Sequence, residues 1–525
     1  MDHLGPRLFC VMLMLMTLSV PSRLCSAGEG GEMGFEIKAF EISGNSLFTQ
    51  EELKDAVAPF TGRKTATDVE KARDALEKLY HDAGYPAVMV NIPEQTIKDG
   101  VVRLQVIESR IGRVKITGNR YFTMAKIMSD LPSLSPGKIL YLPDVQAEIS
   151  RLNRNQDFKV DPVMTPGKEV GTIDVELKVE DKLPLHGYLE LNNRASHDTT
   201  ELRLNAMLRY DNLWQKEHSF SLQYQMTPLK SNEVEVIGAS YVLPAPWEKD
   251  HQLAFYGIYS DSNTAFGEGF RTIGRGEMVG LRYVIPLPQY LLYSHNITIG
   301  LDYKHFDQAE GFETGVQSAP VYYVPLSFSY SASLPDEWGG VTQFSAGLNM
   351  SFRHLGSWTE DKRFNARANY FYATAGVQRT QKLPWGMGLF VKIDGQIADQ
   401  PLIDNEQYSA GGMESVRGYR ESEALGDNAL HGTVEVSFPD PLTKQEVGKW
   451  FQMTPFLFYD AAKLRVKDAL PGQESNIFLD GTGAGMRGSI AKYLEYEVDW
   501  AVTLNATAQT KRYGQKGYFK IRAVF

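Results

Sequence analysis

Apolar and polar residues alternate along many stretches between residue 185 and the C-terminus. In residues 202–210, 297–304, 344–353 and 494–504, every second side chain is apolar, and most of the residues between them are charged or polar. A period of two is typical of β-strands with one apolar and one wet face. Each segment has about ten residues, the length that a tilted strand needs to cross a bilayer, whereas soluble strands usually have about five or six. The pattern therefore predicts membrane-spanning strands.

The length of this region predicts how many strands it contains. Residues 185–525 number 525 − 184 = 341, and about ten residues per strand with as many per turn or loop give about sixteen or seventeen strands. Lipid offers no hydrogen bonds to an open sheet edge, so the sheet must close on itself. Since bacterial barrels have even strand numbers, we predict an all-β transmembrane barrel of about 16 antiparallel strands, with the polar side chains facing a lumen that contains water.

The residues ahead of the barrel region mix short alternating segments with segments of helical periodicity. The sequence ISGNSLFT at Ile42–Thr49 returns as ITGNRYFT at Ile116–Thr123, an offset of 116 − 42 = 74 residues. Two similar modules therefore stand in tandem, at residues 34–109 and 110–181. The first opens with a strand predicted at Glu36–Ile42, and each has the predicted order strand, helix, helix, strand, strand, or βααββ.

Helix-start signals support this order in the first module. Thr49 with Glu52, and Thr67 with Glu70, have the spacing of capping boxes, and Gly84 is placed to end the second helix. The sheet of each module would leave an open edge, to which an extended segment of another chain can add itself as a strand. The alternative is that the modules are spacers.

Residues 408–430 form a glycine-rich loop between two predicted barrel strands. The loop contains Val416, Arg417, Gly418 and Tyr419 in succession. Its glycines permit backbone angles and close approaches that suit a loop folded back on the protein. Taken by itself, the segment favours the alternative, an ordinary surface loop whose arginine is solvated, and the rest of the chain argues against that alternative.

The first 27 residues have the pattern of a secretory signal peptide. Arg7 precedes the apolar run 8–20, and the segment ends with small residues at Ser26 and Ala27. A lipoprotein signal at Cys25 is the competing interpretation, and the arginine and leucine just before Cys25 argue against it. Cleavage after Ala27 would leave no cysteine in the mature chain, which excludes a disulfide framework, thiol catalysis and cysteine-ligated metals.

Composition and motifs give no sign of catalysis. The formal net charge of −10 argues against nucleic acid as a partner. Residues 483–488 spell the dinucleotide-binding pattern GxGxxG, but a predicted strand surrounds them and no helix follows, so we expect these glycines to let the folded-back loop approach the wall. Neither a GxSxG nor an HExxH motif occurs. We expect no enzyme, no cofactor and no metal.

Together, the signal peptide, the two modules, the barrel and the loop resemble the Omp85 superfamily, and within it the two-partner secretion transporters of the haemolysin-activator type. The resemblance covers nearly the whole chain after the signal peptide, and it implies that the modules are periplasmic POTRA domains. The segments that carry it are Gly84–Tyr85, Ile97–Val101, Ile107–Gly112, Asn212–Trp214, Ser240–Pro244 and Val416–Tyr419.

The resemblance also implies roles for particular residues. The family's VRGY loop folds back inside the barrel, where its arginine, here Arg417, meets an aspartate in an aromatic-x-Asp-x-Gly motif. Residues 458–462 match this motif with Asp460, except that Ala462 replaces the glycine. The competing arrangement is that Arg417 and Asp460 are solvated separately. At the C-terminus, apolar residues occupy every second position and the last residue is aromatic, as in the assembly signal of outer-membrane barrels. These residues are Phe519, Ile521, Ala523 and Phe525.

The function implied is that of a protein translocase in the outer membrane of a Gram-negative bacterium. It would export one secreted partner protein without nucleotide hydrolysis, binding the partner by strand addition to the POTRA domains and in the lumen. The lipid bilayer, and the outer-membrane assembly machinery for its own insertion, would be its other partners, and it would be a monomer. The alternatives are an insertase for other outer-membrane proteins and a passive porin or receptor.

The resemblance is imperfect at the start of the chain. Some transporters of this type begin with a helix that plugs the pore. Residues 27–35 leave no room for such a helix, so we expect the loop around Arg417 to gate the pore, or the pore to lie open.

Overall fold

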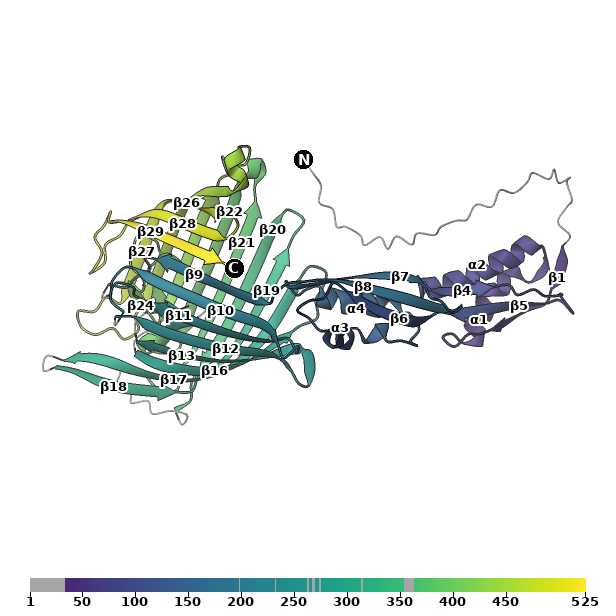
Figure 1. Ribbon diagram of the computed structural model, residues 1–525. Coiled ribbons are helices and arrows are strands. Elements are labelled where there is room, and N and C mark those ends of the chain that lie inside the picture. The colour runs from purple at the N-terminus through teal and green to yellow at the C-terminus, as the bar shows by residue number, and fades with distance from the viewer. Residues whose placement is uncertain are drawn as a thin grey trace. The chain divides into compact units, whose positions relative to one another are not determined.

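The computed structural model describes residues 34–525, apart from residues 198, 232, 262–263, 267–269, 273–274, 313–314 and 354–362. The predicted signal peptide therefore lies outside the described residues. The chain divides into two compact units (Figure 1). In the described chain, residues 34–120 and 127–181 form the first unit, and residues 121–126 and 182–525 form the second.

The first module of unit 1 packs two helices on a three-stranded sheet. Its elements are β1 (Phe35–Ile37), β2 (Ala39–Ser43), α1 (Gln50–Val57), β3 (Gly62–Lys64), α2 (Ala66–Asp82), β4 (Val88–Asn91) and β5 (Val101–Glu108). The sheet order is β2-β5-β4, with β2 parallel and β4 antiparallel to β5. Val69, Ala72 and Leu76 of α2 are buried in the core between helices and sheet. The βααββ order is confirmed, with β1 and β3 as additions.

Two local predictions for this module are wrong. The strand predicted at Glu36–Ile42 breaks at Lys38 into β1 and β2, because β1 pairs with β3 in a separate two-stranded sheet. The capping box of α2 is formed by Thr65 and Asp68, not by Thr67 and Glu70. Both pairs of residues have the spacing of a capping box. The strand pairing of β1 with β3 extends to Lys64, and the helix follows directly, two residues before its predicted start. The predicted box of Thr49 and Glu52 on α1 is confirmed.

The second module repeats the first. Its elements are β6 (Arg110–Thr117), α3 (Met124–Asp130), α4 (Leu142–Leu152), β7 (Phe158–Pro166) and β8 (Thr172–Asp181), with the sheet order β6-β8-β7. Gly44 and Gly118 of the repeated motif both have positive φ, and a Cβ at either would clash with a strand carbonyl, that of Val106 or of Val179. The repeat in the sequence is therefore a repeated close approach between a turn and a strand.

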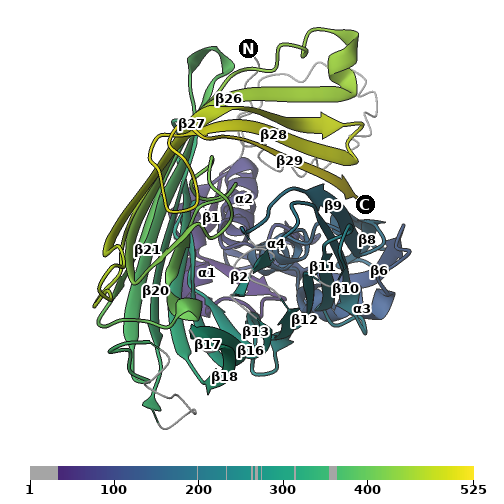
Figure 2. The same cartoon turned by 90° about the vertical axis from the view of Figure 1, so that its left-hand side faces the viewer.

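Unit 2 is a closed antiparallel barrel. Its wall strands are β9 (Leu185–Asn192), β10 (Arg203–Leu213), β11 (His218–Met226), β12 (Glu235–Ala245), β13 (Glu248–Asp261), β16 (Arg275–Pro286), β17 (Ser294–Phe312), β18 (Gly315–Tyr323), β19 (Leu326–Pro335), β20 (Gly340–Met350), β21 (Phe371–Lys382), β22 (Gly388–Ala398), β25 (Asn428–Ser437), β26 (Phe451–Arg465), β27 (Asn476–Ile490), β28 (Leu494–Thr503) and β29 (Gln515–Val524). Figure 2 shows these strands running from teal β10 through green β20 and β21 to yellow β28 and β29.

The predicted strand number is confirmed once β17 is considered. This long strand pairs with β19 through residues 294–301 and with β18 through residues 304–312. β18 and β19 therefore share one place in the wall, and the seventeen strands in the closed order of the described chain occupy sixteen positions. The short strands β14 (Thr264–Phe266) and β15 (Phe270–Thr272) pair with each other outside the wall.

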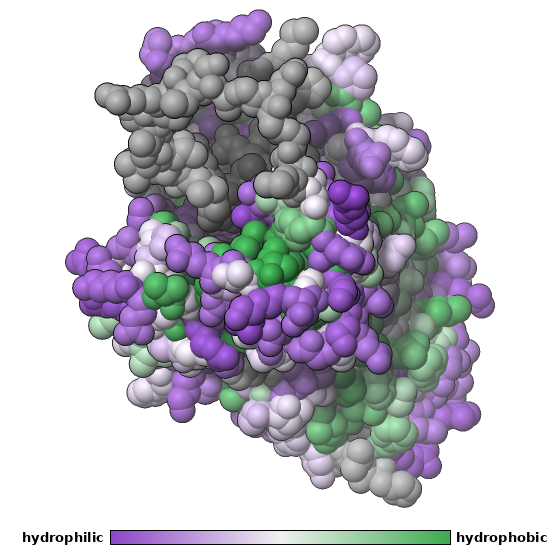
Figure 3. Space-filling view, turned by 90° about the vertical axis from the view of Figure 1, so that its right-hand side faces the viewer, coloured by the Kyte–Doolittle hydropathy of each residue, from purple (hydrophilic) through white to green (hydrophobic). Residues whose placement is uncertain are grey.

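The outer face of the barrel is apolar. Leu208, Phe255, Leu301, Phe344 and Trp500 are each exposed by 42–52% on strands whose alternate residues face the lumen. Hydrophobic residues gather in a green band over the outer wall on the right-hand side of Figure 3. None of the described helices is both long and apolar enough to cross a membrane. The exposed apolar residues named above lie on the wall strands β10, β13, β17, β20 and β28, as in an outer-membrane barrel.

A ring of aromatic side chains marks one end of the barrel. At the end where β9 begins and β29 finishes, every turn between wall strands of the described chain carries an exposed aromatic residue. These residues are Trp214, Trp247, Tyr290, Trp338, Trp385, Trp450 and Tyr493, with exposed fractions of 54–88%. Amphipathic aromatic rings favour the membrane–water interface. Five of the chain's seven tryptophans lie in this ring.

The barrel closes between its first and last strands. β29 pairs with β9 over five residue pairs, from Lys520 with Asn192 to Val524 with Tyr188. Gly187 and Phe525 extend the ladder by exchanging backbone hydrogen bonds of 3.1 and 3.0 Å. Of the predicted C-terminal signal, Phe519, Ile521 and Ala523 lie on β29 and Phe525 follows it; their role in assembly stays a prediction.

The start of α2 gives a pH-dependent prediction. The backbone N–H of Thr65 donates to the Asp68 carboxylate and holds its pKa below the usual value. Because the folded pKa is the lower one, the stabilisation is present above the unfolded pKa, about 3.9, and is lost as the pH falls through the folded pKa. Asp68→Ala should lower the urea midpoint for loss of helical circular dichroism at pH 7, and the difference from the native chain should vanish near pH 2. Glu70→Ala is the control, because Glu70 does not cap the helix, and an equal loss from both variants would contradict the assignment.

Candidate functional site: a loop locked inside the barrel

The loop with the VRGY sequence connects two wall strands. It runs from residue 399, after β22, to residue 427, and its short strands β23 (Tyr408–Ala410) and β24 (Ala424–Gly426) pair as a hairpin. β25 begins at Asn428, so residues 428–430 of the predicted loop belong to the wall. Val416 and Tyr419 are fully buried and Arg417 is 5% exposed. The tip of the hairpin is therefore enclosed by protein, in contrast to an ordinary surface loop.

Arg417 and Asp460 lie in direct contact. The guanidinium donates from Nε to Asp460 Oδ2 at 2.7 Å and from Nη2 to Oδ1 at 2.9 Å. The backbone N–H of Arg417 adds a third bond to Oδ2 at 3.2 Å. Asp460 lies on β26 and is completely buried. A two-pronged, charge-assisted pair of this kind fixes both the position and the orientation of the loop.

Aromatic rings and wall glycines complete the seat of the arginine. The Phe458 ring centre lies 3.4 Å from Arg417 Cζ, so the guanidinium stacks on the ring. A Cβ at Gly483 would clash with this ring, and a Cβ at Gly481 would clash with the carbonyl oxygen of Arg417 itself. The GxGxxG pattern thus lies on a wall strand, β27. The glycine nearest the loop is Gly481, just outside that pattern, while Gly483 makes room for the ring beneath Arg417.

Two further acidic residues face Arg417, and we did not predict either of them. Glu435 of β25 lies 3.4 Å from Nη1 and is also paired with Arg487, and Asp499 of β28 lies 3.7 Å from Nη1. Three carboxylates therefore face two guanidiniums. Both oxygens of Asp499 lack a hydrogen-bond partner among the described residues, although Asp499 is 1% exposed. On β25 and β28 these acidic residues occupy the polar positions of the alternating pattern, which face the lumen. That pattern is the sequence signal that could have identified both.

The residues beside Arg417 bind the wall through their backbone and side chains. Gly418 has φ of 106°, and its N–H donates to the Tyr518 hydroxyl at 2.9 Å, which in turn donates to the Tyr419 carbonyl. The Tyr419 hydroxyl lies 2.8 Å from the carbonyl oxygen of Asn505. Val416 packs with Ala462, the residue that departs from the family motif. The methyl group of Ala462 thus fills space in the apolar cluster around Val416.

The loop is also tied to the segment that follows the first barrel strand. Arg194 donates to Glu421 at 3.1 Å and to Glu414 at 2.5 Å. The backbone N–H of Glu421 donates to the Ala195 carbonyl at 3.1 Å, and His197 lies 2.5 Å from Glu423. These contacts connect the loop to the side of the barrel where β9 meets β29. Sequence spacing could not have revealed them, because more than 200 residues separate the partners.

The root of the loop is fixed by a buried aspartate. Asp427 accepts from both terminal nitrogens of Arg363, at 2.6 and 2.7 Å. It also accepts from the backbone N–H groups of Leu402 and Lys467, each at 2.7 Å. One carboxylate therefore joins the loop to the connections before β21 and after β26. The site therefore consists of one loop that several buried ion pairs hold in place.

The fold and the site define a class of protein. A closed barrel with an apolar outer face, preceded by βααββ modules and containing an in-folded loop, is an outer-membrane β-barrel protein with POTRA modules. A profile of the POTRA domain, ShlB-type, matches residues 35–109. The profile described as haemolysin secretion/activation protein ShlB/FhaC/HecB matches residues 171–488.

Individual relatives are distant but similar over most of their length. The outer membrane transporter CdiB of Dickeya dadantii is 23% identical over 77% of this chain and 72% of its own. The heme/hemopexin transporter protein HuxB of Haemophilus influenzae is 19% identical over 89% and 85%. The structure of CdiB from Escherichia coli is similar with a TM-score of 0.64 and 18% identity, over 96% of this chain and 93% of that one. BamA from Haemophilus ducreyi, lacking POTRA domains 1–3, gives 0.57 and 14%, over 94% and 100%.

The chain belongs to the haemolysin secretion/activation protein family ShlB/FhaC/HecB. It is an outer-membrane secretion transporter of the two-partner type, with its POTRA modules on the periplasmic side. The likeness to CdiB and BamA structures adds the shared fold and nothing about cargo. The end of the barrel with short turns, where the POTRA-bearing chain enters the wall at Leu185, is accordingly the periplasmic end.

The charge arrangement around Arg417 predicts that its acidic partners are not equivalent. A cysteine at Val416 would be protected from maleimide, and the only other cysteines of the chain are Cys10 and Cys25. Asp460→Ala should raise its labelling rate about 100-fold or more, since breaking a buried ion pair costs about 3–5 kcal/mol. Asp499→Asn should leave the rate within about threefold, because it removes the one carboxylate without hydrogen bonds and leaves two of each charge. Equal effects of the two variants would contradict this account.

Proposed function

We propose that this transporter carries one dedicated secreted protein through its barrel in an extended conformation, and that displacement of the Arg417 loop opens the path. The observation that supports this is the burial of Arg417 against carboxylates from three wall strands. A loop held there occupies lumen that a passing chain needs. Its strands β23 and β24 form a two-stranded sheet of their own and are not part of the closed barrel sheet, so the loop can leave without breaking the barrel ladder.

Several ion pairs would have to break together when the loop moves. Arg417 with Asp460 and Arg194 with Glu421 hold the tip, and Arg363 with Asp427 holds the root. Each buried pair would cost about 3–5 kcal/mol if one partner were left alone. A passing chain reduces this cost by offering its own polar groups and by admitting water. Folding of the partner outside the cell would then make the passage directional, with no nucleotide hydrolysis.

Docking of the partner would use an open strand edge of a POTRA sheet. In the second module β7 is one edge, and it contains Pro162 and Pro166, which have no N–H to donate. The opposite edge, β6, has eight residues and no proline, and its backbone is paired with residues 137–139 at its start, at Arg110 and Ile111. We therefore favour β6 as the acceptor in this module. In the first module both β2 and β4 are edges.

The other partners follow from the same proposal. The barrel would act as a monomer, since its wall closes on itself, and the outer-membrane assembly machinery would insert it by reading Phe519 to Phe525. The protein would have no catalytic activity, because the site holds a loop and presents no nucleophile or base to a substrate. A competing function, insertion of other outer-membrane proteins, would use the same fold. A passive porin or receptor would need neither docking edge.

The proteins that depend on the transporter separate these functions. The secreted and outer-membrane proteomes are compared among cells with the gene intact, deleted, and carrying Arg417→Ala. We expect one large protein to disappear from the medium and surface on deletion, and to fall strongly in the variant, while other barrels stay constant. A joint decrease of several barrels would instead identify an insertase. Loss of solute uptake with normal export would identify a porin or receptor.

A further inference from the structure

The lumen has two walls of different chemistry. On the wall formed by β17, β19, β20 and β21, the inward-facing residues within 294–298, 329–333, 343–347 and 374–378 are all serine, threonine, asparagine, glutamine or glycine. We call this set the neutral face. Its rungs are in register, as in Asn296 with Ser331, Ser331 with Ser345, and Ser345 with Gly376. Apart from His295, the residues that alternate with it are apolar or aromatic and lie on the outer face, as Phe344 does at 42% exposure.

The opposite wall is charged and is covered by the loop. A cavity of about 510 Å³ there is lined by strands β9 to β11 and β29 together with the loop residues Glu414 and Glu421. Its charged side chains include Glu190, Arg209 and Arg522. The tip of the loop is anchored on β25 to β29 and in the segment after β9. Glu406, nearer the start of the loop, binds Lys304 of β17, Tyr323 of β18 and Tyr372 of β21. On β17 and β21 the neutral face lies closer to the periplasmic end than these anchors do.

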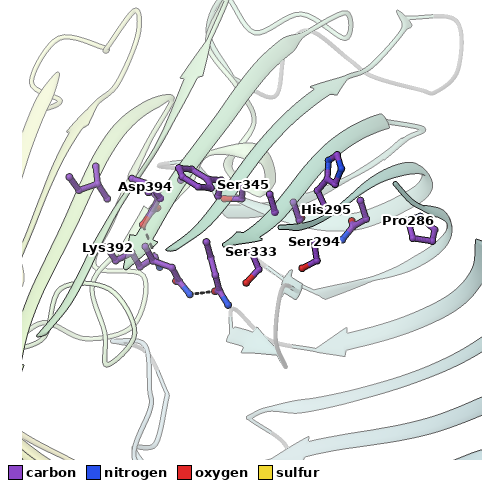
Figure 4. Close-up of a pocket in the computed structure, with 16 residues that line it drawn as sticks. Pro286, Ser294, His295, Ser333, Ser345, Lys392 and Asp394 are labelled. Carbon is purple, nitrogen blue, oxygen red and sulfur yellow. Dashed lines mark hydrogen bonds and ion pairs between the residues drawn. The ribbon is translucent and has the colours of Figure 1, made fainter. Parts of the chain in front are cut away.

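A second cavity lies directly on the neutral face. It has a volume of about 560 Å³ and reaches from Pro286 on β16 across to Lys392 and Asp394 on β22. Figure 4 shows Ser294, Ser333 and Ser345 lining it between these two boundaries. Lys392 and Asp394 are 3.4 Å apart and compensate each other. The cavity lies next to the turns of the periplasmic end, because Pro286 and Ser294 flank the turn between β16 and β17.

We propose that the neutral face is the surface along which an extended segment of the secreted protein slides. The proposal rests on the proposed function, since it needs a polypeptide in the lumen. An extended chain presents N–H and C=O groups at intervals of about 3.3 Å, and hydroxyl and amide side chains can both donate to and accept from them. Each such bond contributes only about 0.5–1.5 kcal/mol net. A charged wall would instead retain or repel the charged residues of the cargo as they pass.

Cross-linking from the two walls tests the position of the cargo. The only cysteines of the chain are Cys10 and Cys25, so single cysteines can be placed at Ser331 or Ser345 on the neutral face, and at Asn205 or Gln223 on the charged wall. The cargo is the protein identified by the proteome comparison, halted in transit by a fused folded domain and carrying one cysteine. We expect disulfide cross-links several times more often from the neutral face. Equal or greater cross-linking from Asn205 and Gln223 would overturn the proposal, whereas no cross-link from any lumenal position would contradict the proposed function itself.

Charge insertion tests the chemistry of the face. Ser331→Asp and Ser345→Lys should each lower secretion about tenfold. A charged side chain in this face would bind cargo residues of opposite charge more strongly than the weak, exchangeable hydrogen bonds do, and it would repel cargo residues of like charge. Asn205→Asp and Gln223→Lys, on the wall that is already charged, should change it less than about twofold. Heat-modifiable migration of each barrel confirms that it is folded. Normal secretion by the folded Ser331 and Ser345 variants, with only ion selectivity altered, would overturn the proposal and assign the face to solutes.

Discussion

The absence of water in the bilayer determines the architecture of this transporter. Every backbone N–H and C=O at membrane depth must be paired within the protein, so the sheet has to close between β9 and β29. Closure creates an interior that is shielded from lipid, and the polar half of each alternating strand lines it. The chain can therefore hold charged groups such as Arg417 and Asp460 at a depth where lipid contact would be prohibitive.

The loop is buried in this interior as a segment is buried in the core of a soluble domain, and ion pairs hold it in addition to apolar contacts such as that of Val416 with Ala462. Apolar burial would hold the loop with little directional selectivity, whereas Arg417, Arg194 and Arg363 each hold it through an oriented pair. Such pairs are strong when dry and weak when water enters. Under the proposed function, a lock built from them would be stable in the resting barrel and would open when a hydrated polypeptide arrives. This suits a transporter that acts without nucleotide hydrolysis.

The asymmetry of the lumen follows from where the loop is anchored. The tip of the loop is held by β25 to β29 and by the segment after β9, and those strands carry many lumenal charges. On the opposite side, Glu406 of the loop binds Lys304 of β17, Tyr323 of β18 and Tyr372 of β21. Nearer the periplasmic end of that side, the inward residues are small and uncharged, as Ser329, Ser331 and Ser333 on β19 are. One side of the barrel thus binds the tip of the loop, and the periplasmic part of the other side presents the neutral face.

The sequence by itself determined the architecture, because alternation, the repeated ISGNSLFT motif and the length of the barrel region depend on local periodicity and on the bilayer thickness. It also indicated Arg417 and Asp460, through a resemblance carried by short motifs. Only the tertiary structure decided which groups surround Arg417. Glu435, Asp499 and Arg194 meet the loop through the register of distant strands, and no local pattern records that register. The same limit explains the shifted cap at Thr65, where pairing with β1 overrode an equally good local signal.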